Sequence, residues 1–123
     1  RVQLHWADMA GLSAILGDKT YDVVFCTGVL MYLDRPEALA VVRDMLSRCR
    51  RLLALSGPAW SEGDNRTLAH PVRRETDGSF IHNLDELVTA SGGEVIGRRW
   101  EGARQVDGHT IYFVFARPRC RPA

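Results

Sequence analysis

The sequence predicts an α/β fold, a mostly parallel sheet with one antiparallel strand near an edge, and two patterns carry this prediction. Short apolar runs rich in β-branched and aromatic residues alternate with amphipathic helical segments over most of the chain, which is typical of parallel sheets. The last two runs, 94–100 and 110–116, are separated only by a connector. Such a pair favours a closing antiparallel hairpin.

The first half of the chain is expected to alternate strand, helix, strand, helix. Residues 2–6 alternate in polarity and predict a short strand, and a brief helix is expected over 10–16. The run 22–26 shows no alternation, so we expect a strand covered on both faces. Asp34 is expected to cap the strongest helix, which has a proline in its first turn and apolar residues at helical spacing to about residue 50.

The second half begins with a short apolar strand over 51–56. The stretch 59–81 is polar and has no sustained period, and a loop of this length in a compact domain is usually a lid or a binding loop. A helix is expected to begin at His82 or Asn83 and to stop at a pair of glycines, residues 92 and 93.

The end of the chain is expected to hold the hairpin and a tail. Residues 101–108 are rich in turn-forming types and predict the connector between the two last strands. A proline- and arginine-rich tail is expected over 117–123. The sequence therefore predicts one domain over residues 1–116.

Composition excludes several function classes. The chain has 123 residues, of which 46% are hydrophobic and 25% charged, with a net charge of +1. A nearly balanced charge argues against nucleic acid and membrane surfaces as partners. Arginine clusters at 48, 50–51 and 73–74 are expected to be solvated helix ends and loops. No apolar run is long enough to cross a bilayer.

The cysteines and histidines do not form a metal-binding or disulfide pattern. The three cysteines are odd in number and widely spaced, and none belongs to a CxxC pair. The four histidines have no HxH or HxxxH spacing. These observations predict no metal site and a reducing, cytoplasmic setting. The N-terminal residue is not methionine, and we expect the chain to be a processed or truncated piece.

Two stretches resemble a known family. YDVVFCTGVLMYLDRP at 21–36 resembles the fourth-strand motif of class I S-adenosylmethionine-dependent methyltransferases, and HWADMAGL at 5–12 is similar to the preceding motif. The resemblance covers nearly the whole chain. It implies a Rossmann-like α/β sheet that is incomplete, comprising strands 3 to 7 of the family order 3-2-1-4-5-7-6.

The resemblance also implies a cofactor site in two parts. Asp8 would accept a hydrogen bond from the adenine amino group of S-adenosylmethionine, with Ala7 and Met9 beside the ring. The residues that follow the second strand would form the other part. Cys26, Thr27 and Gly28 would lie at the methionine end, and Val29 and Leu30 would wall the adenosine pocket.

Acceptor-side residues are expected in the long loop and next to it. Tyr32 occupies a position that is often histidine in the family, which leaves an acid-base role there open, although a phenol can offer an oxygen or a ring face to a sulfonium. Tyr32, His70 and His82 are the candidate catalytic residues. Substrate contacts are predicted from Tyr32, Trp60, His70, Arg73, Arg74, Phe80, His82 and Asn83. A solvated surface loop is the alternative interpretation.

The predicted activity is methyl transfer from S-adenosylmethionine to a small-molecule acceptor by in-line displacement. The alternative is a methyltransferase-like module without catalysis that serves binding or dimerisation. A nicotinamide-dependent oxidoreductase is disfavoured because no GxGxxG turn is present.

The family's Gly-rich loop and the acidic residue that binds the ribose are missing, which leaves a gap between the third and fourth strands. Three alternatives fill that gap: an N-terminal half that completes the domain, the third strand placed directly against the fourth, or a homodimer. One of them is needed because unpaired backbone groups on both sides of the gap would be costly, and we favour the first.

Overall fold

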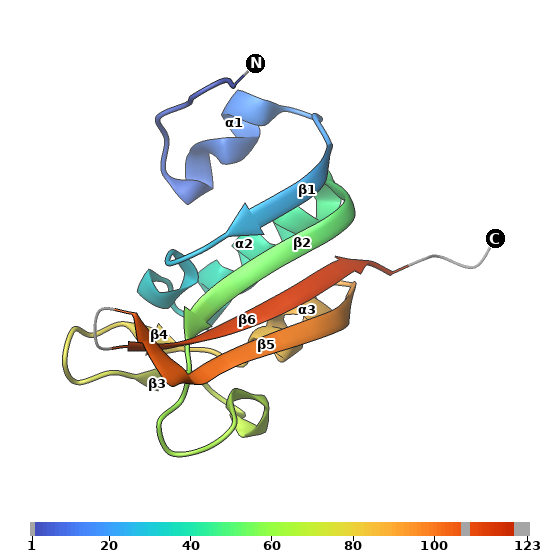
Figure 1. Cartoon of the computed structure of the whole chain (residues 1–123). Helices are drawn as coiled ribbons and strands as arrows, with labels where there is room; N and C mark the ends of the chain where they lie inside the picture. The colour runs from blue at the N-terminus through green and yellow to red at the C-terminus, as the bar shows by residue number, and fades with distance from the viewer. Residues whose placement is uncertain (1, 107–108, 120–123) are drawn as a thin grey trace.

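The computed structural model describes residues 2–106 and 109–119 and contains a four-stranded mixed sheet (Figure 1). The sheet order is β1-β2-β6-β5. β1 and β2 are parallel, whereas β6 is antiparallel to both of its neighbours. These strands are β1 (Tyr21–Cys26), β2 (Cys49–Pro58), β5 (Gly93–Val106) and β6 (His109–Pro118). The order agrees with the one expected for these four strands and confirms an α/β Rossmann-like domain with a terminal antiparallel hairpin.

Two helices cover one face of this sheet, α2 (Arg35–Arg48) and α3 (Leu84–Ala90) (Figure 1). Both caps agree with the sequence. Asp34 and Glu37 form a reciprocal capping box at the start of α2, and the Asn83 side chain accepts from the Glu86 amide at the start of α3. The core lies between the helices and the sheet, and its fully buried members include Val42, Leu53, Leu55, Leu87, Val88 and Val114.

The N-terminal segment corrects one prediction. Residues 2–6 do not form a strand and do not pair with β1; the first elements are the 3-10 helix η1 (Met9–Gly11) and α1 (Leu12–Leu16). α1 lies beside the edge of β1 that faces away from β2 (Figure 1). A strand is stable only when a neighbour pairs with its backbone, and within the described residues this segment has no such neighbour.

A second correction concerns the coverage of β1. Val23 is 55% exposed and Phe25 is 73% exposed, whereas Cys26 is buried. The sheet face opposite α2 and α3 carries no helix of the described chain (Figure 1). The apolar run was therefore correctly predicted as a strand, but the expected cover on both faces is wrong for the described residues.

The C-terminal hairpin is longer than predicted. β5 runs to Val106, so residues 101–106 are strand where a connector was expected, and residues 107 and 108 lie outside the described residues. Gln105 pairs with Thr110 and Val106 pairs with His109. β6 extends to Pro118, two residues into the expected tail, and residues 120–123 also lie outside the described residues.

The stretch 59–81 is more ordered than its lack of period suggested. It contains the 3-10 helix η3 (Asn65–Thr67) and a two-stranded sheet of β3 (Val72–Arg73) and β4 (Phe80–Ile81). In Figure 1 this stretch lies near the end of β2 at which the strand arrow points, which is its carboxyl end. It is therefore placed on the side of the sheet where open α/β folds bind ligands.

Candidate functional site

A largely apolar pocket of about 360 Å³ runs along β1 between α1 and α2. Its wall combines residues from the N-terminal elements, from β1 and the turn after it, and from α2. They are Met9, Leu12, Leu16, Tyr21, Val24, Phe25, Cys26, Thr27, Val29, Asp44, Met45 and Arg48. Met9, Cys26, Thr27 and Val29 were all predicted from the sequence to contact the cofactor, and the fold brings them to one cavity.

The Asp8 side chain organises the N-terminal part of this wall. It caps η1, and its Oδ1 accepts a hydrogen bond from the Gly11 amide at 2.8 Å. This cap starts the turn that carries Met9 towards the core. Ala7 and Asp8 themselves are exposed and are not among the lining residues, so their contact with an adenine ring stays a prediction.

The turn after β1 explains the need for glycine at residue 28. Gly28 has φ +69°, a left-handed conformation that side chains disfavour, while a Cβ there would meet no heavy atom within 4 Å. The residue is thus required by backbone conformation and not by crowding from the chain. The following 3-10 helix η2 (Leu30–Tyr32) buries Leu30 completely, which fixes Val29 at the pocket wall.

Cys26 is one of the residues that line the pocket. It is buried, and burial raises its pKa, so the neutral thiol is favoured at neutral pH. A neutral thiol is a weak nucleophile. We therefore assign Cys26 a packing role in the wall and no covalent role. Among the described residues, no cluster of His, Cys, Asp and Glu could hold a metal ion.

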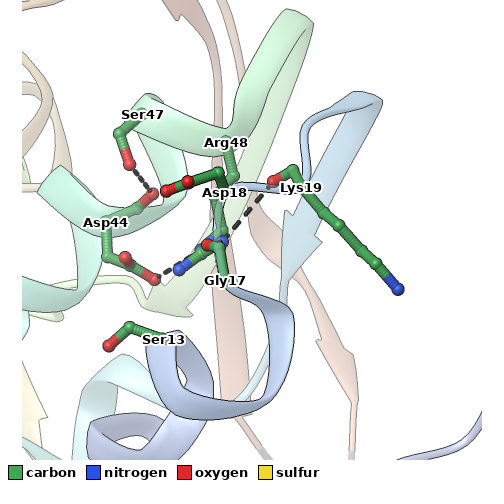
Figure 2. A pocket seen from close by; sticks show the side chains of 7 residues that line it. All are labelled: Ser13, Gly17, Asp18, Lys19, Asp44, Ser47 and Arg48. Carbon is green, nitrogen blue, oxygen red and sulfur yellow. Dashed lines mark hydrogen bonds and ion pairs between the residues drawn. The ribbon is translucent and has the colours of Figure 1, made fainter.

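Arg48 lines both the apolar pocket and a second, more polar pocket of about 420 Å³, which Figure 2 shows. Its Nε donates to Asp44 Oδ2 at 3.1 Å, and its Nη1 donates to the carbonyl oxygens of Gly17 and of Lys19, the latter at 3.4 Å. The side chain therefore ties the loop after α1 to the end of α2. Arg48 is only 7% exposed, so its assignment to a solvated helix end was wrong.

The predicted acceptor-side residues do not line either of these two pockets. Tyr32 is 69% exposed, His70 is exposed, and Trp60 is half-buried. Asn83 Oδ1 accepts from the Glu86 amide in α3, and its Nδ2 donates to the loop carbonyls of Arg66 and Leu68. The Arg73 guanidinium lies over the Phe80 ring at 5.7 Å, and Arg74 is held near Asp77. Their contact with a substrate stays a prediction.

The His82 imidazole is hydrogen-bonded to the turn after β1. It is 3% exposed, and its Nε2 lies 3.0 Å from Leu30 O and 2.9 Å from Leu33 O. Because both partners are carbonyl oxygens, Nε2 must carry the proton. This side chain serves the fold, and its predicted part in catalysis stays untested.

The buried imidazole predicts a pH dependence of stability. Burial lowers the pKa of His82, an effect that the two carbonyl contacts only partly oppose. The unfolded chain, with a histidine pKa of about 6.5, therefore takes up a proton before the folded chain does. Stability from this group is complete above that pH and is lost as pH falls towards the folded-state pKa.

Denaturant unfolding of the wild type and of His82→Gln between pH 7.5 and pH 5 measures this effect. We expect the wild type to lose more free energy of unfolding than the variant, by up to about 1.4 kcal/mol per pH unit below pH 6.5. Parallel curves for the two proteins would contradict the lowered pKa.

Sequence reasoning missed Arg48 and Asn65. Asp44 and Arg48 have the i, i+4 spacing of a helical ion pair, which was an available signal, although it does not show burial. Asn65 is 3% exposed, and nothing in the polar stretch around it distinguishes it from its neighbours.

No protein-family model and no curated protein matches the chain. Magnesium protoporphyrin IX methyltransferase from Synechocystis PCC 6803 with bound SAH matches with a TM-score of 0.64 and 18% identity, over 92% of this chain and 49% of that one. A SAM-dependent methyltransferase from Leishmania major matches with a TM-score of 0.67 and 14% identity, over 90% and 43% of the two chains. The chain has the class I methyltransferase fold.

The same fold occurs with more than one chemistry. A structure described as a pericyclic reaction enzyme matches with a TM-score of 0.56 and 14% identity over 80% of this chain, so the fold alone does not decide the reaction. The match covers 49% of the Synechocystis enzyme, so the chain spans about half of that protein's length. No helix in the described part of the chain is long and apolar enough to cross a membrane.

Proposed function

We propose that the chain contributes to an S-adenosylmethionine-dependent methyltransferase that acts on a small-molecule acceptor. The observation that supports the proposal is the pocket beside β1, because Met9, Cys26, Thr27 and Val29 all line it. Its volume and apolar wall suit a flat ring system. Residues Ala7 to Met9 and Cys26 to Val29 would hold the cofactor. The setting we propose is cytoplasmic.

The residues of this chain can supply positioning and exclusion of water. When bound, S-adenosylmethionine offers a methyl group on a positively charged sulfur. The site then has to hold the methyl group in line with the acceptor atom, a task for pocket walls and backbone groups. Cys26 on the pocket wall is buried, which would help to exclude water from the site. Tyr32, on the exposed side of η2, is our candidate for the acceptor side.

Polar groups for the rest of the cofactor would come from further polypeptide. Asp44 is the only carboxylate on the described pocket wall, and it already accepts from Arg48. The exposed Val23 and Phe25 support the same proposal, because apolar side chains on a sheet normally pack against a second layer. We propose an N-terminal half as that layer. A homodimer that serves binding without catalysis is the alternative.

Isothermal titration with S-adenosylhomocysteine, run on the wild type and on two variants of α1, tests the proposal. Leu12 lines the pocket, whereas Ile15 on the same helix is 38% exposed and does not. The chain alone has the pocket wall but lacks the polar contacts of the proposed N-terminal half, so we expect the wild type to bind no more tightly than in the micromolar range. Leu12→Trp should fill the pocket and raise Kd about tenfold or more, a loss of about 1.4 kcal/mol, while Ile15→Trp should bind as the wild type does.

Equal Kd values for the two tryptophan variants would move the cofactor site away from this pocket. Absence of binding by the wild type calls for the same titration with the chain extended at its N-terminus. If the extended protein also fails to bind, the methyltransferase proposal is wrong and the non-catalytic alternative is favoured.

A further inference from the structure

A buried network of hydrogen bonds connects the loop 59–81 to the turn beside the pocket. Its centre is Asn65 in η3, which is 3% exposed. Asn65 Nδ2 donates to His82 O at 2.9 Å and to Pro58 O at 3.1 Å, and its Oδ1 accepts from the Trp60 amide at 2.9 Å. One side chain thus joins the carboxyl end of β2, the start of the loop and His82, the residue before the N-cap of α3.

The network continues from His82 to the pocket. The backbone carbonyl of His82 accepts from Asn65, while the imidazole of the same residue binds Leu30 O and Leu33 O. These carbonyls belong to η2 and its C-cap, directly after Val29 on the pocket wall. Asn65 itself lines neither pocket. Any effect of Asn65 on the pocket must therefore pass through His82 or through the strand end at Pro58.

The two side chains at the centre of this network, Asn65 and His82, are desolvated, so water cannot readily replace the hydrogen bonds that they make. Asn65 and His82 are each 97% buried, since each is 3% exposed. A buried polar network that is fully satisfied holds its members in one arrangement, and the loss of one member disturbs the others. A change at Asn65 should thus be felt at η2.

We propose that Asn65 is a positioning residue that fixes the pocket wall through His82, so that the loop 59–81 and the turn after β1 are set as one unit. The role in binding rests on the proposed function, namely that the pocket accepts S-adenosylhomocysteine. The coupling between Asn65 and η2 does not rest on it, and the two can be measured separately.

Amide hydrogen exchange measured by NMR on the ligand-free chain tests the coupling. The reporters are the amides of Tyr32 and Leu33, which donate to Val29 O and Leu30 O and do not contact Asn65. The matched control is Asn83→Ala. Asn83 is also an asparagine, and its side chain makes as many hydrogen bonds as that of Asn65, to the loop and to α3. We expect Asn65→Ala to speed exchange at both reporters about tenfold more than the control does.

Equal exchange at the reporters in the two variants, or faster exchange confined to residues 58–66, would overturn the proposal. If Asn65→Ala does not fold, His82→Leu breaks the same connection from its other end and the reporter becomes the Trp60 amide. His82→Gln should then restore slow exchange, because its Nε2 can donate to the same carbonyls; failure of this rescue would also overturn the proposal.

The binding role is tested by titration with S-adenosylhomocysteine. Asn65→Ala should raise Kd about fivefold or more relative to the wild type. An unchanged Kd in Asn65→Ala limits Asn65 to the fold and overturns its positioning role. If neither the wild type nor the N-terminally extended chain binds, the proposed function has failed, and the exchange measurement alone decides whether the coupling exists.

Discussion

Replacing Arg48 with alanine will lower the free energy of unfolding by about 3 kcal/mol, because it removes charge-assisted hydrogen bonds from a buried guanidinium and leaves their acceptors without a donor. The acceptors are Asp44 Oδ2 and the carbonyl oxygens of Gly17 and Lys19. Urea unfolding followed by circular dichroism measures the loss. Because the loop after α1 loses its anchor, the variant should also expose Met9 and the pocket wall.

Two further variants test whether the stability depends on the hydrogen bonds of Arg48, which we call the Arg48 clamp, or only on its positive charge. Arg50 forms an ion pair with Asp22 in which the two side chains are 57% and 62% exposed, so Arg50→Ala should cost less than about 1 kcal/mol. Arg48→Lys keeps the charge but loses the planar fork of donors, and should recover only part of the stability. A cost for Arg48→Ala no larger than that for Arg50→Ala would show that the clamp is not formed.

Replacing Gly93 with alanine should cost about 2 kcal/mol of unfolding free energy, as is typical of overpacking a well-packed core. A Cβ at this position would lie 2.8 Å from Val88 Cγ1 and 2.9 Å from Leu46 Cδ1. Both neighbours are buried, on α3 and α2, so neither can move aside freely. The same unfolding measurement reports the loss.

The adjacent glycine is the control for this variant. Gly92 has φ +87°, and a Cβ there would meet nothing within 4 Å. Asparagine tolerates the left-handed region better than other residues, so Gly92→Asn should cost less than about 1 kcal/mol. If Gly93→Ala lowered the free energy of unfolding no more than Gly92→Asn does, the two helices would not approach the start of β5 as closely as the structure shows.

Local signals in the sequence were sufficient where a few neighbouring residues decide the structure. Asp34 and the proline in the first turn predicted the start of α2, and the capping box of Asp34 and Glu37 confirms it. For α3 the sequence left His82 or Asn83 as the starting residue, and the structure has Asn83 as the N-cap. A cap satisfies backbone groups within one turn of itself, so its evidence is complete within a short stretch of sequence.

The candidate site was predictable only in part. The residues after β1 and next to Asp8 were marked by their motifs, and Met9, Cys26, Thr27 and Val29 do share one cavity. The acceptor side was not predictable, because which side chains of a loop face a ligand depends on how that loop folds back. His82 shows this, since a residue considered for catalysis is buried against the carbonyls of Leu30 and Leu33.

By itself, the sequence determined the class of fold, the starts of the two main helices and the closing hairpin, since periodicity and capping are properties of short segments. Tertiary structure alone decided that Arg48 and Asn65 are buried, that Gly93 has no room for a side chain, and that Val23 and Phe25 lie on an open face. Burial is set by segments that are distant in the chain. An apolar strand therefore shows that a face can be covered, but not which polypeptide covers it.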